Sequence, residues 1–97
     1  MRIIARKTLK EFWDREPASE DALKAWHKEV EKALWNDPAD IKEQYRSASI
    51  LKNNRVVFNI CGNKYRLVVS ISYEVKIVFV RFIGTHNEYD KINAEVV

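Results

Sequence analysis

The feature that most constrains the fold is the alternation of apolar and polar residues across residues 55–90, RVVFNICGNKYRLVVSISYEVKIVFVRFIGTHNEYD. Alternation with a period of two is typical of β-strands that bury one face. Two dipeptides, Gly62–Asn63 and Glu74–Val75, divide the stretch into three segments. The stretch therefore predicts a three-stranded antiparallel meander that ends in a polar loop.

The first turn sets the register of the first two strands. A two-residue turn at Gly62–Asn63 places Phe58 opposite Leu67 and Asn59 opposite Arg66. Asn63 is the residue expected to adopt a positive φ in this turn.

The second turn extends the same assignment to the third strand. A turn at Glu74–Val75 places Val69 opposite Val80 and Leu67 opposite Phe82. The predicted core face then carries Val56, Phe58, Ile60, Leu67, Val69, Ile71, Val78, Val80 and Phe82. The predicted polar face carries Arg55, Asn59, Lys64, Arg66, Ser70, Ser72 and Arg81.

The N-terminal part predicts a short strand and a first helix. Residues 2–5 are β-branched enough to form an edge strand that pairs with the meander. Thr8 and Glu11 have the spacing of a capping box, which predicts a helix that starts at Thr8. Pro17 ends this helix.

A second, longer helix follows, with Ser19 as its expected cap and Asp37–Pro38 at its end. Apolar residues at three- and four-residue steps give both helices a face that packs on the sheet. The predicted fold is α+β, in the order β-α-α-β-β-β, with the two helices on one face of a small, mainly antiparallel sheet. Residues 39–54 give only a hint of one helical turn. At 97 residues, the chain is expected to form a single domain, 1–97.

Composition limits the classes of function. The net charge of +3 is a mild preference for anionic partners. Cys61 is the lone cysteine, which excludes an internal disulfide and fits a reducing cytoplasm. One cysteine and two widely spaced histidines make a zinc site unfavourable, so no metal or cofactor is expected. The longest apolar runs are too short for a membrane span, and the start lacks a signal peptide.

Two arginines on the predicted polar face indicate an anion site. Under the predicted register, Arg66 and Arg81 are near neighbours, and two guanidiniums repel each other unless an anion bridges them. The alternative is that each pairs with a surface carboxylate. Because no acidic residue falls on the predicted face, we favour binding of an anion such as a phosphodiester.

Several other residues are candidates for contacts with nucleic acid. Lys64 would contact a phosphate, and Asn59 a ribose or a base. Arg55 and Lys91 add to the basic cluster in the second half of the chain. Phe79 falls on the polar face, where either the C-terminal residues or a partner would cover it.

The last motif, T-H-N-E-Y-D, offers groups for proton transfer. His86 can give or take a proton near neutral pH, and Tyr89 can donate one or stack on a base. The residues alone favour a structural role for both, as an exposed loop histidine and a buried tyrosine. Asp90 would either fix the imidazole tautomer or cap the last turn.

The runs VVFNICGNKYRLVV and VRFIGTHNEYDKI resemble the HigB family of bacterial toxins, within the RelE/ParE-like superfamily. The resemblance rests on the spacing of G-N-x-Y-R-L and T-H-x-x-Y-D, and it extends to the N-terminal half only in layout. It implies a RelE-like fold and a small toxin that cleaves mRNA on translating ribosomes. It also implies a helix-turn-helix antitoxin, HigA-like, as the cognate partner. With it, His86 becomes the favoured acid–base group.

The resulting hypothesis is a metal-independent, ribosome-dependent mRNA endoribonuclease in which the substrate 2′-hydroxyl attacks the adjacent phosphate. The catalytic residues would be Arg66, Arg81, His86 and Tyr89, and the RNA-binding residues would be Arg55, Asn59, Lys64 and Lys91. The toxin alone is expected to be monomeric, cytoplasmic and free of membrane contacts. Two alternatives remain, namely a ParE-like toxin that binds DNA gyrase without cleaving RNA, and an inactive RNA-binding relative.

Overall fold

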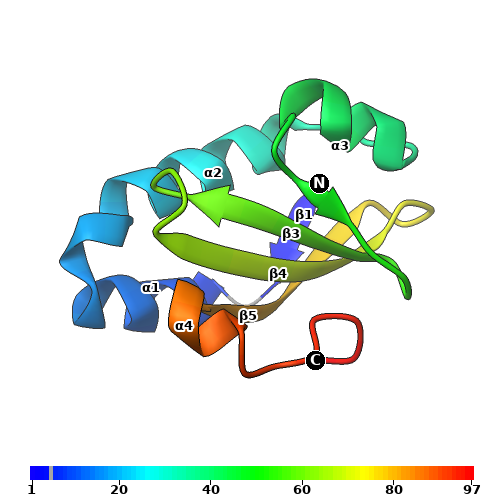
Figure 1. Ribbon diagram of the computed structural model, residues 1–97. Coiled ribbons are helices and arrows are strands. Elements are labelled where there is room, and N and C mark those ends of the chain that lie inside the picture. Colours follow the sequence, from blue (N-terminus) through cyan, green and yellow to red (C-terminus); the bar gives the residue numbers. More distant parts are fainter. Residues whose placement is uncertain (5) are drawn as a thin grey trace.

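A computed structural model describes residues 1–4 and 6–97, and Figure 1 shows the arrangement of its elements. Residue 5, which was predicted as the last of the first strand, lies outside the described residues. The elements in chain order are β1 (Arg2–Ile4), α1 (Arg6–Arg15), a 3₁₀ turn (Pro17–Ser19), α2 (Glu20–Lys32), α3 (Pro38–Gln44), β2 (Ser49–Ile50), β3 (Arg55–Ile60), β4 (Tyr65–Ser72), β5 (Ile77–Thr85) and α4 (His86–Tyr89).

The strands form one five-stranded sheet in the order β1-β5-β4-β3-β2. All neighbours are antiparallel except β1, which runs parallel to β5. The α+β class and the mainly antiparallel sheet predicted from the sequence are therefore confirmed. Within the described residues, no helix is long and apolar enough to cross a membrane.

The helix boundaries differ from the predicted ones at two caps. α1 begins at Arg6, so Thr8 lies inside the helix and does not start it. Ser19 does occupy the position before α2, but its hydroxyl donates to the carbonyl of Glu16 at 2.7 Å and caps nothing. The predicted end of the first helix is confirmed, because α1 stops at Arg15, two residues before Pro17.

Residues 39–54, which gave only a weak pattern, contain α3 and the short strand β2. Asp37 caps α3 by accepting a hydrogen bond from the Asp40 amide at 3.0 Å, and Pro38 fills the first helical position. Asp37–Pro38 thus starts a third helix, whereas α2 has already ended at Lys32.

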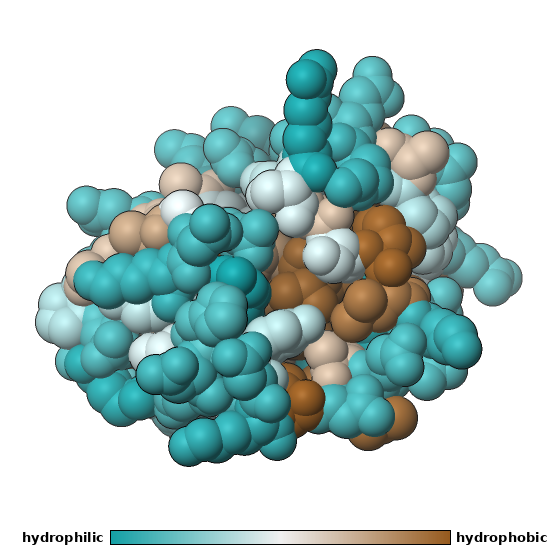
Figure 2. Space-filling model, viewed as in Figure 1, coloured by the Kyte–Doolittle hydropathy of each residue, from teal (hydrophilic) through white to brown (hydrophobic). Residues whose placement is uncertain are grey.

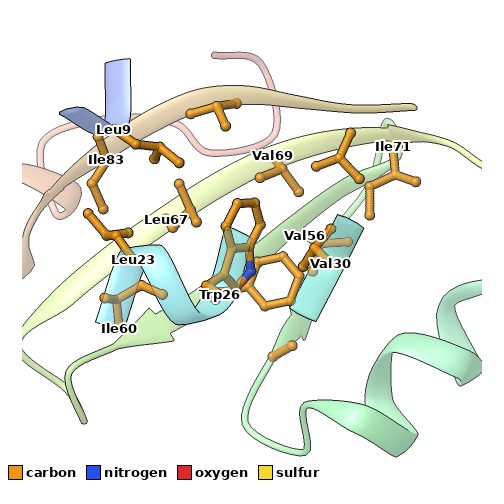
Figure 3. Packing of buried hydrophobic residues seen from close by; sticks show 14 of the residues in the cluster. Leu9, Leu23, Trp26, Val30, Val56, Ile60, Leu67, Val69, Ile71 and Ile83 are labelled. Atoms are coloured by element: carbon orange, nitrogen blue, oxygen red, sulfur yellow. The ribbon is translucent and has the colours of Figure 1, made fainter. Parts of the chain in front are cut away.

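The main core lies between the helices and one face of the sheet (Figure 3). α1 buries Leu9, Phe12 and Trp13, and α2 buries Leu23, Trp26 and Val30. The sheet contributes Val56, Phe58, Ile60, Tyr65, Leu67, Val69, Ile71, Val78, Val80 and Ile83. We call the face that carries these side chains the inner face and the opposite one the outer face.

The register between β3 and β4 is as predicted, with Phe58 opposite Leu67 and Asn59 opposite Arg66. The turn itself differs in one respect, since Cys61 and Gly62 adopt the positive φ angles, 57° and 67°, and not Asn63. A register set by the centre of the turn survives this change in backbone conformation.

A β-bulge changes the register between β4 and β5. Val69 faces Val80 as predicted, but a shift between Val68 and Val69 puts Leu67 opposite Ile83 and not opposite Phe82. The extra residue reverses the alternation of the strand, so Phe82 moves to the outer face and Ile83 takes its place in the core. The prediction that Phe82 belongs to the core face is therefore wrong.

Candidate active site on the outer face

The outer face gathers most of the residues that the sequence singled out. β3 presents Arg55, Val57 and Asn59, β4 presents Arg66, Val68, Ser70 and Ser72, and β5 presents Phe79, Arg81, Phe82 and Gly84. The predicted polar face is thus confirmed for its strand residues, while Lys64 lies in the turn beyond them. The bulge adds Phe82 to this face, next to Val57 and Val68, which the sequence did not predict.

The centre of the outer face is covered by the C-terminal residues. Val57, Val68 and Ala94 form a second buried cluster, against which Leu51, Phe82, Tyr89, Ile92 and Val97 pack. We call these eight residues the outer cluster. Figure 1 shows the C-terminal segment on the side of the strands opposite α2, and Figure 2 shows hydrophobic surface bordered by hydrophilic residues in the same view.

Arg55 holds the C-terminal segment in place. Its Nε and Nη2 donate to the main-chain oxygen of Val97 at 3.1 and 2.6 Å, and its Nη1 donates to the carbonyl of Asn53 at 3.0 Å. The amide of Asn53 in turn donates to the Glu95 carbonyl at 3.0 Å. Most donors of Arg55 are therefore already engaged by main-chain oxygens, and the side chain is half-buried.

A polar group lies at the hairpin end of the face. Arg66 is half-buried and donates from Nη1 to the carbonyl of Asn63 at 3.0 Å, so it points towards the β3–β4 turn. Asn59 is its cross-strand neighbour. Lys64 is exposed, with its ammonium 5.6 Å from the centre of the Tyr65 ring. Arg66 is the cation that this group presents on the outer face, since the Lys64 ammonium lies against an inner-face ring and the Asn59 amide donates to the Ser47 carbonyl at 3.4 Å.

The helix α4 begins beside this group because a capping box forms there. The amide of Glu88 donates to the Thr85 hydroxyl at 3.2 Å, and the amide of Thr85 donates to the Glu88 carboxylate at 2.9 Å. Arg15 of α1 lies over the Phe12 ring and reaches the same carboxylate at 3.3 Å. The Thr85 amide, with Arg15 in addition, lowers the pKa of Glu88 from its ordinary value.

α4 presents the two candidates for proton transfer differently. His86 is exposed, and its Nδ1 lies 3.2 Å from Oδ2 of Asp90, so Nδ1 is the nitrogen that carries a proton towards the carboxylate. Nε2 has no hydrogen-bond partner among the residues that the structure describes. Tyr89 is half-buried and packs on the outer cluster.

Arg81 lies in the middle of β5, and its side chain is directed away from the hairpin end. Its Nε donates to the Ser70 hydroxyl at 3.4 Å, and its guanidinium carbon lies 5.5 Å from the centre of the Phe79 ring. Ser70 is four residues along β4 from Arg66, which corresponds to about 13 Å. The two arginines therefore share a face, as predicted, but they turn apart and the outer cluster lies between them. Lys91 is exposed and follows α4.

Cations on the two sides of the protein differ in their partners. Each ion pair within residues 1–4 and 6–97 involves a helix, as in Lys10–Asp14, at 3.0 Å, and Lys24–Glu20. None of the outer-face cations makes an ion pair within those same residues. The strands of the outer face thus carry cations and no carboxylate in the described ranges, which favours the binding of phosphate groups.

Comparison with known proteins identifies the family to which this chain belongs. The family model for the HigB toxin, a RelE-like toxic component of a toxin-antitoxin system, matches residues 19–92. The chain belongs to the HigB toxin family. As a member of a toxin-antitoxin family, it is expected to act with an antitoxin partner.

Curated relatives extend the HigB match to nearly the whole chain. The mRNA interferase toxin HigB of Escherichia coli K12 is 29% identical over 96 residues, which cover 97% of this chain and 92% of the relative. The mRNA interferase HigB of Shigella flexneri shows the same identity and coverage. The mRNA interferase HigB of Escherichia coli O6:H1 is 26% identical over 94 residues, which cover 95% of this chain and 91% of the relative.

The capping box of α4 and its contact with Arg15 were not predicted from the sequence of this HigB-family toxin. Thr85 and Glu88 have the spacing of a capping box, so the start of α4 was readable from the sequence. The contact of Arg15 with Glu88 could not be predicted from the sequence, because Glu88 lies 73 residues further along the chain and no local pattern joins the two residues.

Proposed function

We propose that this protein is a ribosome-dependent mRNA endoribonuclease, the toxin of a toxin-antitoxin pair, and that it needs no metal. The observation that carries the proposal is the outer face, where cations without carboxylate partners lie next to a helix that presents an exposed imidazole. The names of the curated relatives, which are mRNA interferases, support the same activity.

The proposed reaction uses the RNA's own nucleophile. The 2′-hydroxyl attacks the adjacent phosphorus, the bond from phosphorus to the 5′-oxygen breaks, and a 2′,3′-cyclic phosphate and a 5′-hydroxyl result. One group takes the proton from the 2′-hydroxyl, and another gives a proton to the leaving 5′-oxygen. His86 and Tyr89 supply these two roles, with Nε2 of His86 facing the substrate because Nδ1 is directed at Asp90.

Arginines stabilise the charge that develops on the phosphate. Arg66, with Lys64 and Asn59 beside it, is assigned to the scissile phosphate because this group lies at the end of the face where α4 begins. Arg81 is assigned to a phosphate further along the same strand, since the outer cluster separates it from Arg66. Arg55 and Lys91 flank the path of the RNA.

The substrate and partner follow from the same proposal. The substrate is mRNA held on the ribosome, which orients the RNA because the open outer face does not enclose it. The site of action is the cytoplasm. A cognate helix-turn-helix antitoxin holds the toxin in check, and the toxin alone is a monomer with a single domain. A ParE-like attack on DNA gyrase is the competing function, and it would leave messages uncut.

The test is growth arrest after induction of single variants, combined with mapping of transcript ends. Arg66→Ala, Arg81→Ala and His86→Ala should each relieve the arrest and remove the new ends. Lys10→Ala, on the helical side, is the matched control and should stay toxic. Full toxicity of all three outer-face variants, or arrest with intact transcripts and damaged DNA, would contradict the proposal.

A further inference from the structure

The part of the outer face nearest β1 carries an aromatic side chain that the proposed chemistry does not use. Phe79 lies on β5 between Ser70 of β4 and Ile4 of β1, its partners in the two ladders. The ring is half-buried, and Ile4 beside it is 37% exposed. An aromatic ring next to an exposed isoleucine on a basic face offers apolar surface to a ligand.

Phe79 is not a member of the outer cluster. The outer cluster includes Phe82, three positions further along β5, but not Phe79. Among the described residues, Phe79 therefore takes no part in the apolar contact that the C-terminal residues make in that cluster. Of the two explanations that the sequence suggested for this side chain, we adopt the partner.

The groups around the ring indicate what kind of partner fits. The guanidinium of Arg81 lies 5.5 Å from the ring centre, and Ser70, which accepts a hydrogen bond from Arg81, fixes its direction. Arg2 occupies the same face two residues before Ile4, since the side chain of Ile3 packs on the main core. No carboxylate occupies an outer-face position on any strand in the described ranges.

We propose that Phe79 forms a subsite for one unpaired base of the RNA substrate, with the base stacked on the ring and Arg81 bound to the adjoining phosphate. Stacking on aromatic rings next to a basic groove is how proteins generally hold single-stranded RNA. The inference rests on the proposed ribonuclease function and deepens it, because it names a place where the substrate is gripped away from the bond that breaks. Ser70 acts as a positioning residue for Arg81.

The experiment is a double-mutant cycle between the protein and the RNA. Cleavage rates are measured on ribosome-bound messages in which each nucleotide near the cut is replaced, in turn, by an abasic one. Wild type, Phe79→Leu and Phe79→Tyr are compared, and circular dichroism confirms that each is folded. Loss of one stacked base should cost about fivefold or more in rate.

The expected result is a single position at which base removal slows the wild type but has no further effect on Phe79→Leu, while Phe79→Tyr behaves like the wild type. Multiplicative effects at every position, or a Phe79→Leu variant as fast as the wild type, would overturn the subsite and leave the nuclease intact. A wild type that cuts no ribosome-bound message would overturn the proposed function itself. Loss of antitoxin binding in Phe79→Leu at an unchanged cleavage rate would assign the ring to the antitoxin and overturn the subsite.

Discussion

The helical side and the outer face of the sheet both carry many cations, but they use them differently. On the helices, Lys7, Lys10 and Lys24 each lie one turn from a carboxylate, and even the groove of about 560 Å³ between α1 and α2 is lined by such pairs. On the outer face, Arg66 and Arg81 bond only to uncharged oxygens within the described residues. Paired helical lysines add a few tenths of a kcal/mol to the stability of a helix. Arginines without a carboxylate partner can instead attract an anionic ligand with their full charge. Counting charges over the whole chain would have hidden this difference.

The two sides also differ in what stabilises them. The inner face packs against three helices and fully buries Phe58, which contacts the rings of Trp26, Trp35 and Tyr45. The outer cluster is smaller, and most of its members, including Phe82, are only half-buried. The inner face therefore supports the fold, and the outer face keeps surface free for a ligand.

The largest expected effect tests this division directly. Phe58→Ala should lower the free energy of unfolding by about 3–5 kcal/mol, because it empties a fully enclosed site. Phe82→Ala should cost about 1–2 kcal/mol, since part of its ring already meets solvent. Urea denaturation followed by circular dichroism measures both. Equal losses would mean that the outer cluster is as important to stability as the main core.

The next effect concerns Gly84, which the bulge places on the outer face. A Cβ there would lie 2.5 Å from Cζ of Phe82 and 3.1 Å from Cβ of Glu88, so Gly84→Ala must displace the ring or α4. We expect a loss of about 1–3 kcal/mol in stability together with loss of cleavage. Gly62→Ala is the control, because its Cβ meets nothing within 4 Å and only its positive φ is strained. A fully active Gly84→Ala variant would show that the position of α4 does not matter.

A smaller effect, on the salt dependence of RNA binding, distinguishes an outer-face cation from a helical one. Arg66→Ala should reduce the slope of log K against log salt by about 0.7 when a short single-stranded RNA is bound. Lys10→Ala should leave this slope unchanged, because Lys10 is neutralised by Asp14. Fluorescence anisotropy over a range of salt concentrations gives both slopes. The comparison fails if the helical lysine changes the slope as much as the arginine does.

The smallest expected effect is a pH dependence of the unfolding free energy that comes from Glu88. The pKa of Glu88 is lowered in the folded protein from its ordinary value of 4.5, chiefly by the bond from the Thr85 amide. The stability that Glu88 contributes is thus complete above pH 4.5 and is lost as the pH falls through the lower, folded value. The difference in unfolding free energy between wild type and Glu88→Gln should therefore shrink from pH 6 to pH 3. A constant difference would rule out this carboxylate as the cause.

Local patterns predicted the parts of the fold that depend on neighbours in sequence. The position of the first turn predicted the β3–β4 register, alternation predicted the side of Arg66 and Arg81, and helical spacing predicted the burial of Trp26 on α2. Arg81 is the extra residue of the bulge, since Val80 and Phe82 pair with the consecutive residues Val69 and Val68. The bulge was not predictable, because the apolar Phe82 continues the period-two pattern of Val78 and Val80. Phe82 was misplaced for that reason.

The site was predictable in its composition but not in its spacing. The sequence identified the residues of the outer face, yet it placed Arg66 and Arg81 side by side. Their separation depends on the bulge and on the C-terminal segment that Arg55 holds across the face. Contacts between residues far apart in sequence, such as Arg15 with Glu88, leave no local trace.

The parallel pairing of β1 with β5 has a consequence for how the protein is assembled. The first strand has one neighbour in the sheet, and that neighbour is the last strand, since Arg2 pairs with Ile77. During synthesis, β1 must therefore wait, unpaired, until almost the whole chain has emerged. Closing so distant a pair is an intrinsically slow step, so the sheet gains its first strand last.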